Sequence, residues 1–273
     1  VLLRIQDEAA KFYQEQLHHS PEGARAIAYL RKRDFTDETI RDYGIGFAPD
    51  KWSSLLNHLT RKGARAELIE RAGLAIPRKG GQGHYDRFRN RVMIPIASEM
   101  GRIIAFGGRI LGDGEPKYLN SPDTPLFDKG RTLYNLHRAA PAARKSGRMI
   151  VVEGYMDAIA LAQAGFEEAV APLGTALTET QIEMLWRHVE RPILCFDGDK
   201  AGQKAAMRAV SRALPLLRPA HSLAIVRLPT GLDPDDLLRE QGADAMERLL
   251  AQPAGLLDTL WDFEKSAAPL DSP

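Results

Sequence analysis

The apolar residues of this chain follow two different periodicities. Up to about residue 76 they recur at helical spacing, as Ile5, Ala9 and Phe12 do, and this predicts a series of short helices. Two apolar runs follow at residues 91–96 and 102–106, separated by a Ser-Glu-Met-Gly stretch. That pattern predicts a β-hairpin.

From residue 149 onward, short apolar runs alternate with amphipathic stretches. This β-α-β-α-β-α-β series is typical of a mostly parallel sheet covered by helices. Thr178 and Gln181 form a capping-box pattern at the start of one helix. The predicted strands are residues 149–152, 168–172, 192–196 and 223–228, and the predicted helices are residues 156–164, 178–189 and 201–217, with more helix over 233–264.

Glycine and proline gather in two stretches between these regions. Residues 78–86 are glycine-rich and basic, and residues 112–130 hold three glycines and three prolines, so we expect loops at both places and a helix over 133–144. The fold class is α/β. Its expected parts are an α+β part over residues 1–148, a parallel-sheet α/β part over 149–232 and a helical segment over 233–273.

Composition places the chain among ordinary globular proteins. It has 273 residues, 44% hydrophobic and 27% charged, which excludes a disordered tail, a collagen-like repeat and a disulfide-stapled miniprotein. Cys195 is the single cysteine, so the usual structural zinc sites are excluded and a reducing compartment is expected. No apolar run is long enough to span a bilayer, and no signal peptide is recognisable. Because the chain starts at Val1, we expect a fragment of a longer cytoplasmic protein.

The net charge of +1 hides an uneven distribution. Residues 78–148 carry 14 basic and 6 acidic side chains, whereas residues 149–273 carry 11 basic and 19 acidic ones. The basic block is a candidate surface for a polyanion, and the acidic block is a candidate for holding metal ions. On composition alone, solvated faces of uneven charge explain these numbers equally well.

Carboxylates follow three of the four predicted strands. Glu153 follows the first strand, Asp197 and Asp199 follow the third, and Asp233 and Asp235 follow the fourth. Because the carboxyl ends of parallel strands meet at one edge, these acids are expected to lie close together. Clustered carboxylates suit Mg²⁺ or Mn²⁺, two of which can hold the attacking and leaving oxygens of a phosphoryl transfer, while Glu153 could instead be a general acid or base. A lone aspartate here is more often a helix cap, and Asp233 before a proline fits that alternative.

Several motifs make the chain similar to a known family. VVEGYMD, followed two predicted strands later by FDGDKAG, resembles the TOPRIM domain, the Glu…Asp-x-Asp phosphotransfer fold of primases, topoisomerases and some nucleases. YDRFRNRVMIPI, GRIIAFGGRIL and PKYLNSPDTPLFDKGRTLYNL, in this order, resemble the core of bacterial DnaG-type primases. The resemblance runs from about residue 24 to the end of the chain. It covers neither the zinc-binding nor the helicase-binding domain of such primases, so we expect the RNA polymerase core only.

The resemblance implies roles for individual residues. It implies two or more Mg²⁺ or Mn²⁺ ions as cofactors, with no zinc in this part of the protein. The residues that match the catalytic and metal-binding acids are Glu153, Asp197 and Asp199, and those that match supporting metal ligands are Asp157, Asp233 and Asp235. The residues implied to line the groove for nucleotides and nucleic acid are Arg33, Arg87, Arg89, Arg91, Arg109, Lys117, Tyr118, Asn120 and Lys129.

The function that the resemblance implies is DNA-templated synthesis of short RNA primers by a primase core. The expected partners are single-stranded DNA, ribonucleoside triphosphates and an RNA–DNA hybrid, with the replicative helicase bound through a further domain and no membrane. Two alternatives stay open. A nuclease or topoisomerase of the same fold would cleave nucleic acid, and a non-catalytic scaffold would only bind it, although a scaffold has no need for clustered acids. Neither a P-loop nor a nucleophile elbow occurs in the sequence.

Overall fold

The computed structural model describes residues 1–267, and the chain divides into two compact units at Lys129 and Gly130. We expected the first part to end at residue 148 instead. The difference arises at the helix α6 (Leu136–Ser146), because its Leu136 and Ala143 join the apolar core of the second unit. The C-terminal helices also belong to the second unit, and the expected boundary at residue 233 does not divide it.

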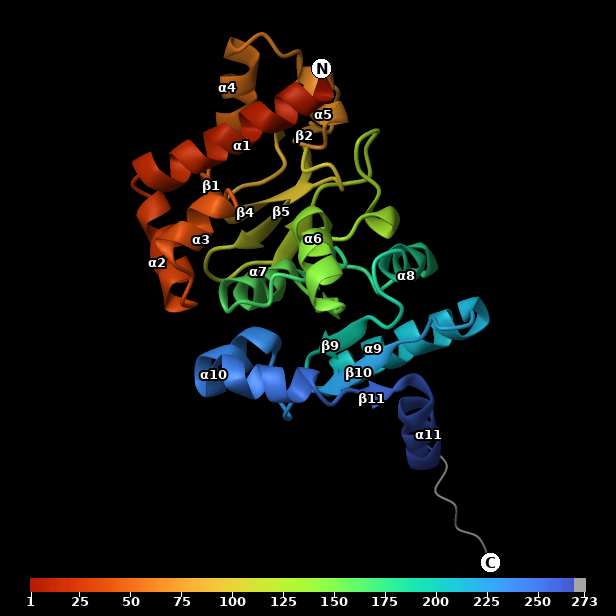
Figure 1. Ribbon diagram of the computed structural model, residues 1–273. Helices are drawn as coiled ribbons and strands as arrows, with labels where there is room; N and C mark the ends of the chain where they lie inside the picture. Colours follow the sequence, from red (N-terminus) through yellow and green to blue (C-terminus); the bar gives the residue numbers. More distant parts are fainter. Residues whose placement is uncertain (268–273) are drawn as a thin grey trace, which may run out of the picture. The chain divides into compact units, whose positions relative to one another are not determined.

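The first unit packs helices against a small antiparallel sheet. Its helices are α1 (Leu2–His19), α2 (Gly23–Lys32), α3 (Asp37–Asp42), α4 (Ser54–Arg61) and α5 (Ala66–Arg71). Its strands are β1 (Gly46–Ala48), β2 (Ala75–Pro77), β3 (His84–Asp86), β4 (Arg91–Ala97), β5 (Ile103–Ile110) and β6 (Tyr118–Asn120). Helix α1 lies along one face of the sheet (Figure 1), where the Tyr13 ring meets Phe106 edge-on at 5.3 Å.

The predicted hairpin is confirmed and forms the centre of this sheet. The strand order is β1-β4-β5-β6, and β2 pairs separately with β3. Strand β6 lies inside residues 112–130, which we expected to be a loop without strands, and β1 and β2 lie among the expected helices. These strands have three residues each, which is too short to show the alternation that identifies a strand in sequence.

The second unit is the predicted parallel α/β arrangement. It begins at Gly130, within the short 3₁₀ helix η1 (Lys129–Arg131). Its strands are β7 (Ile150–Val151), β8 (Ala169–Val170), β9 (Ile193–Phe196), β10 (Ala224–Arg227) and β11 (Ala254–Gly255). Besides α6, its helices are α7 (Tyr155–Gln163), α8 (Glu179–Trp186), α9 (Lys200–Ala213), η2 (Leu214–Leu216), α10 (Pro234–Leu250) and α11 (Leu256–Ala267). The strand order is β11-β10-β9-β7-β8, and every pairing is parallel except that of β11.

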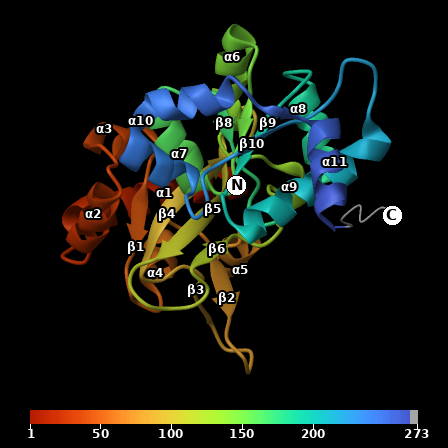
Figure 2. The ribbon, with the colours of Figure 1, turned by 90° about the horizontal axis from the view of Figure 1, so that it is seen from below.

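Helices cover both faces of this sheet (Figure 2). Alternate strand residues such as Val151 and Leu194 point into a core shared with α6, α8 and α9. Cys195 lies one position further along β9, is fully buried, and faces the other way. Burial raises the pKa of its thiol to about 12, with smaller contributions from Asp157 and Asp197.

Local signals explain where two helices of this unit begin. The Thr178 side chain accepts a hydrogen bond from the Gln181 N–H, and the Gln181 side chain accepts one from the Thr178 N–H, so the predicted capping box is confirmed. Asp233 caps α10 through Oδ1, which accepts from the Asp236 N–H at 2.7 Å, with Pro234 in the first turn. The alternative of a helix cap for Asp233 is therefore realised in the structure.

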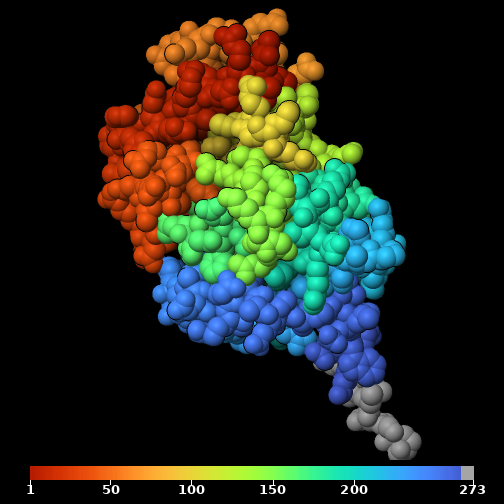
Figure 3. All heavy atoms as spheres, viewed as in Figure 1, coloured from red at the N-terminus to blue at the C-terminus, as the bar shows by residue number. Residues whose placement is uncertain are grey.

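The last described helix, α11, stands out from its unit (Figure 3). It exposes Leu257, Trp261 and Phe263. Within residues 1–267, no helix combines the length and the apolar character that crossing a membrane requires.

Candidate active site and nucleic-acid interface

The predicted acids of the second unit lie at the carboxyl ends of its strands. Glu153 follows β7, Asp197 and Asp199 follow β9, and Asp233 follows β10. Asp199 is also the N-cap of α9, because its Oδ1 accepts a hydrogen bond from the Gly202 N–H at 2.7 Å. Capping uses one oxygen of Asp199 and one of Asp233, which leaves the second oxygen of each carboxylate for another ligand.

Asp197 is at the centre of this group. Its backbone N–H donates a hydrogen bond to Glu153 Oε1 at 3.0 Å. Burial raises the pKa of Asp197 to about 7, and the negative charges of Glu153 and of other acids nearby add to the rise. Those other acids are Asp233, Asp199 and Asp236. These carboxylates therefore lie close enough to repel one another.

Glu153 shares this environment. Its pKa is raised by burial and by the charge of Asp199, while the hydrogen bond from Asp197 and the cation of Arg208 on α9 oppose the rise. Arg208 is thus a cation beside the acids that sequence reasoning did not single out. Its position two turns into α9 gives no local signal, since only the parallel sheet brings α9 next to the residue after β7.

The predicted supporting acids lie in the first turns of α7 and α10 or at the cap of α10. Asp157 lies in the first turn of α7, and a Cβ placed on Gly154 would lie 3.2 Å from its Oδ2. Asp235 is only 2% exposed, and Arg239 Nε lies 3.8 Å from its Oδ1. Asp236, its neighbour, is one of the acids that raise the pKa of Asp197. The Asp-Pro-Asp-Asp run is visible in the sequence. Which of its acids influence Asp197 depends on the helix that Asp233 caps.

The chemistry of these acids suits a divalent cation, although their side chains do not form a complete coordination site among the described residues. Asp197 Oδ1 is inaccessible to solvent and has no hydrogen-bond partner among the described residues, so a carboxylate oxygen is desolvated with nothing to offset the cost. A cation is the partner that would relieve this desolvation and the repulsion between the acids. Within residues 1–267, however, no three acidic, histidine or cysteine side chains converge into a ready metal site.

Two glycines let the backbone around these acids pack closely. A Cβ on Gly202 would lie 2.1 Å from the carbonyl oxygen of Asp197, and a Cβ on Gly198 would lie 2.1 Å from that of Pro229. Such distances do not occur in real proteins, so any side chain at either position would displace the Asp197 loop. The glycines of the DGDKAG motif thus serve the geometry of the acids.

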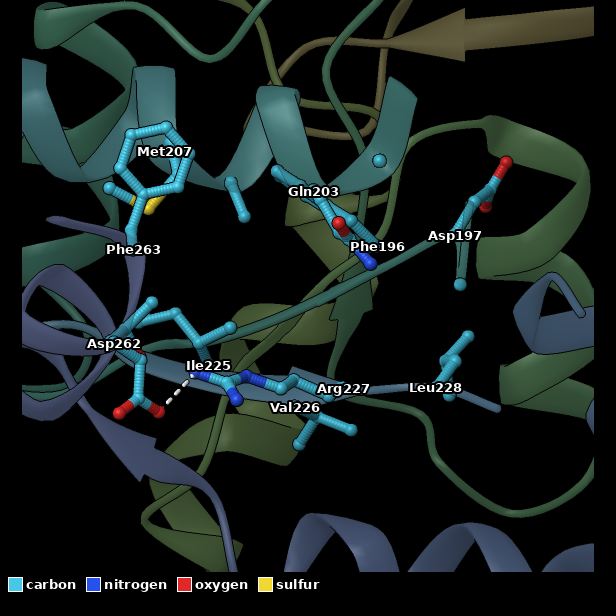
Figure 4. A pocket seen from close by; sticks show the side chains of 14 residues that line it. Phe196, Asp197, Gln203, Met207, Ile225, Val226, Arg227, Leu228, Asp262 and Phe263 are labelled. Carbon is cyan, nitrogen blue, oxygen red and sulfur yellow. Dashed lines mark hydrogen bonds and ion pairs between the residues drawn. The ribbon is translucent and has the colours of Figure 1, made fainter. Parts of the chain in front are cut away.

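A cavity of about 440 Å³ lies beside Asp197, between α9, β10 and α11. Figure 4 shows the Asp197 carboxylate at one end of it and Met207 with Phe263 at the other, with the ion pair of Arg227 and Asp262 along one wall. Most of the lining is apolar, including Phe196, Ile225 and Leu228. A triphosphate needs polar donors, so this cavity is not its binding site.

In the first unit, the predicted basic residues form two patches in which cations alternate with aromatic rings. The first patch contains Arg33, Tyr29, Arg109, Tyr118 and Lys117. The Arg109 Cζ lies 4.7 Å from the centre of the Tyr29 ring, and Arg33 Nη1 donates to the Tyr29 hydroxyl at 3.4 Å. Tyr118 stands directly opposite Arg109 in the pairing of β5 with β6 and is 40% exposed, and the Lys117 Nζ lies 5.9 Å from its ring.

The second patch surrounds Trp52, which lies just before α4. Trp52 is 57% exposed, and the Arg89 Cζ lies 3.7 Å from the centre of its ring. The Tyr85 ring meets Trp52 at 5.4 Å, and the Arg78 Cζ lies 5.8 Å from Trp52 and 5.7 Å from Tyr85. Each guanidinium group is attracted to the face of the ring beneath it. The patch therefore offers positive charge to phosphates and exposed ring surface on which a base can stack.

Two of the remaining predicted residues of this unit, Arg87 and Arg91, donate hydrogen bonds to the backbone. Arg91 is 5% exposed and donates through Nη1 to the carbonyl oxygen of Gly108 at 3.1 Å, so the structure gives it a packing role. Arg87 donates through Nη2 to the carbonyl oxygen of Asn120 at 2.9 Å, which places these two predicted residues side by side. The backbone N–H of Lys129 donates to Asp123 Oδ1 at 3.0 Å.

Comparisons of the sequence with known families match both units. The family model described as the DNA primase catalytic core, N-terminal domain, matches residues 12–140, and a Toprim-like model matches residues 150–238. A DNA primase of Pseudomonas aeruginosa is 48% identical over 246 residues, which are 90% of this chain and 37% of that protein. A DNA primase of Rickettsia felis is 43% identical over 97% of this chain and 43% of its own length. The chain spans less than half the length of these relatives.

Solved structures give the same result for the fold. A DNA primase domain from Pseudomonas aeruginosa superposes with a TM-score of 0.93 at 44% identity, covering 100% of this chain and 85% of that one. The primase catalytic core of E. coli superposes with a TM-score of 0.90 at 42% identity, covering 100% and 87%. A third structure, a DnaG primase catalytic domain bound to ssDNA, has a TM-score of 0.89 at 41% identity and covers 100% and 84%.

Proposed function

This chain belongs to the DnaG-type DNA primases, within their catalytic core, and we propose that it catalyses the synthesis of short RNA primers on a single-stranded DNA template. The observation that carries the proposal is the acid cluster around Asp197, with its buried unpartnered oxygen, at the carboxyl end of a parallel sheet. Clustered acids of this kind suit nucleotidyl transfer, because that reaction develops negative charge on phosphate and on the attacking oxygen.

In this proposal the acids of the second unit hold divalent cations, Mg²⁺ or Mn²⁺. Toprim-type primases are in general metal-dependent. Glu153, Asp197 and Asp199 would hold the metal directly, supported by Asp157 and Asp233. Asp235 would support it as well, and Asp236 is a further candidate, because its charge contributes to the raised pKa of Asp197. When bound, the cations would supply activation of the attacking 3′-hydroxyl and neutralisation of the leaving pyrophosphate.

The chain's own residues would prepare this site. The hydrogen bond from the Asp197 N–H fixes one oxygen of Glu153 and would leave the other free to bind a cation. The Gly202 and Gly198 contacts keep the Asp197 loop close to the start of α9. Arg208 offsets part of the repulsion before any ligand arrives. This preorganisation means that little rearrangement is needed when substrate binds.

The two basic patches of the first unit are the proposed nucleic-acid surface. Arg33, Arg109 and Lys117 would neutralise phosphates of the template or of incoming ribonucleotides, and Tyr118 would stack on a base. Arg89 and Trp52 would do the same in the second patch. A DnaG primase catalytic domain has been solved with ssDNA, which supports a DNA template as the ligand. Arg87, Asn120 and Lys129 would border this surface, whereas the buried Arg91 would support it from within.

We expect the full-length protein to bind further partners through parts outside this chain. We propose that the whole protein acts in the cytoplasm at the replication fork, where the RNA–DNA hybrid forms and the replicative helicase binds a further domain.

Primer synthesis is the direct test of the proposal. Labelled ribonucleotides, single-stranded DNA and Mg²⁺ or Mn²⁺ would be incubated with the wild type and with Glu153→Gln. We expect short RNA from the wild type and at least a hundredfold less from the variant. If neither makes RNA, a zinc-binding domain of a relative is added in trans. The absence of RNA product in that reaction would contradict the proposal. Cleavage of the template without added nucleotides would indicate a nuclease instead.

A further inference from the structure

Tyr29 lies between two arginines of the first unit, and none of the motifs draws attention to it. It is half-buried on α2. Its hydroxyl accepts a hydrogen bond from Arg33 Nη1 at 3.4 Å, and its ring receives the Arg109 guanidinium at 4.7 Å. One side chain thus contacts both arginines through two different interactions.

The fold explains how these residues meet. Tyr29 and Arg33 are one helical turn apart, so they share a face at the end of α2. Arg109 comes from β5, where Tyr118 of β6 stands directly opposite and shares its side of the sheet. Tyr29 therefore links the end of a helix to the strand pair β5 and β6, on which the candidate nucleic-acid residues Arg109 and Tyr118 lie.

Two guanidinium groups held near each other repel, and the tyrosine lies where it offsets this cost. The face of an aromatic ring is electronegative and attracts Arg109, while the hydroxyl oxygen is an acceptor for Arg33. Arg109 Nη1 also donates to the carbonyl oxygen of Ile110, so the guanidinium is held on both sides. Among residues 1–267, no carboxylate forms an ion pair with Arg109, so its charge stays available for an anion.

A long, flexible arginine loses side-chain entropy when it binds a phosphate, and part of that loss is avoided if the side chain is already held in place. We propose that Tyr29 is a positioning residue, which holds Arg33 and Arg109 so that they bind neighbouring phosphates of a single-stranded nucleic acid together. This inference rests on the proposed function and concerns the same surface. Tyr29 itself does not have to touch the nucleic acid.

The test separates the two interactions of Tyr29. Tyr29→Phe removes the hydroxyl and keeps the ring, so it should affect Arg33 alone. Tyr29→Leu removes both. Binding of a fluorescein-labelled oligo(dT) would be followed by fluorescence anisotropy at several salt concentrations, for each variant alone and combined with Arg33→Gln or Arg109→Gln.

We expect Tyr29→Phe to weaken binding by about twofold and Tyr29→Leu by about five- to tenfold. The effect of Arg33→Gln should shrink in both Tyr29 backgrounds. The effect of Arg109→Gln should shrink only with Tyr29→Leu. The thermal melting temperature of Tyr29→Phe should equal that of the wild type, which separates positioning from folding.

Three outcomes would overturn the inference. Additive losses in all combinations would mean that Tyr29 contacts the nucleic acid itself or acts through general stability. Unchanged binding by Tyr29→Leu would mean that the arginines need no positioning. If the wild type does not bind the oligonucleotide, the nucleic-acid surface fails as well, and primer synthesis by the wild type tells whether the proposed function fails with it.

Discussion

The backbone N–H of Asp197 donates a hydrogen bond to Glu153 Oε1 at 3.0 Å and so joins the ends of two neighbouring strands, β9 and β7. Burial raises the pKa of the Asp197 carboxylate to about 7, and the negative charges of Glu153 and of other acids nearby add to the rise. An arrangement that opposes its own ionisation costs stability at neutral pH, which indicates that the acids are placed for a ligand and not for the fold.

The first prediction concerns this cost. Because the pKa of Asp197 in the folded chain is raised above its ordinary value of 3.8, the stability that this group contributes is greatest below about pH 4 and is lost as the pH rises toward 7. Asp197→Asn should therefore be more stable than the wild type at pH 8, by about 1 kcal/mol once solvent screening is allowed for. Urea unfolding of both proteins at pH 4.5 and pH 8 measures this difference in the free energy of unfolding.

Added Mg²⁺ should narrow this difference at pH 8, because it stabilises the wild type by binding the folded state and stabilises the variant less. Asp244→Asn, at an exposed position of the same unit, is the matched control and should leave both effects unchanged. Equal stabilisation of wild type and Asp197→Asn by Mg²⁺ would count against a cation at Asp197.

The second prediction concerns Asp86, a buried acid of the first unit that caps α4 from outside the helix. Its two carboxylate oxygens accept hydrogen bonds from the N–H groups of Leu55 and Leu56, both at 2.8 Å. Burial nevertheless raises its pKa from 3.8 to about 6, despite these bonds and the nearby Arg89. The favourable contribution of the protonated group is present below about pH 4 and is lost as the pH rises through 6.

Asp86→Asn should abolish this part of the pH dependence, which amounts to roughly 3 kcal/mol at most between pH 4 and pH 7. The amide offers one oxygen in place of two, so the variant also loses about 1 kcal/mol at every pH. Chemical denaturation across that range measures both quantities, with Asp50→Asn at an exposed position as the control. If the free energy of unfolding of Asp86→Asn depends on pH as that of the wild type does, Asp86 is not the group responsible.

The third prediction concerns Gly202 at the start of α9. Gly202→Ala would place a methyl group 2.1 Å from the carbonyl oxygen of Asp197, so the loop that carries Asp197 must move. We expect a loss of about 2–3 kcal/mol in the free energy of unfolding and a large loss of primer synthesis. Ala201→Ser changes the exposed neighbour by a similar volume and should be nearly neutral. Full activity of Gly202→Ala would show that the loop position is not needed.

The fourth prediction concerns Trp52 and its partner Arg89. If the ring stacks on a base, Trp52→Leu should weaken binding of a labelled oligo(dT) by about tenfold, while Trp52→Phe should retain most of it. Trp261 is a matched control, because it is 63% exposed and belongs to the other unit. Trp261→Leu should bind as the wild type does, and equal losses for both variants would indicate a nonspecific effect of removing tryptophan.

Much of the second unit could be predicted because its signals are local. The capping box at Thr178 and the alternation of apolar runs with helices are both read within a few residues, and the parallel order then brings the acids to one edge. Which acids of residues 233–236 influence Asp197 was not readable from the sequence, since that depends on which way a helix turns after its cap. The short strand β6 was missed because its three residues show no strand pattern by themselves, and only their pairing with β5 defines the strand.

The contacts of the first unit were the least predictable. Trp52 and Arg89 lie in separate segments, and only the pairing of β2 with β3 and the placement of α4 bring them together. Tyr29 looks like one more helical aromatic until β5 is placed beside it. Arg91 matched a family motif, yet its position at the start of β4 turns its guanidinium into the protein. Whether a basic side chain meets solvent is a property of the tertiary packing.

The burial of Cys195 makes the natural chain convenient for chemical labelling. The single thiol lies inside the sheet with its pKa raised to about 12, so it stays protonated and shielded at the pH at which maleimides react. A cysteine introduced at an exposed position near Trp52 would then be the reactive thiol. A dye attached there would report the arrival of a nucleic acid strand in real time, without first removing a core residue.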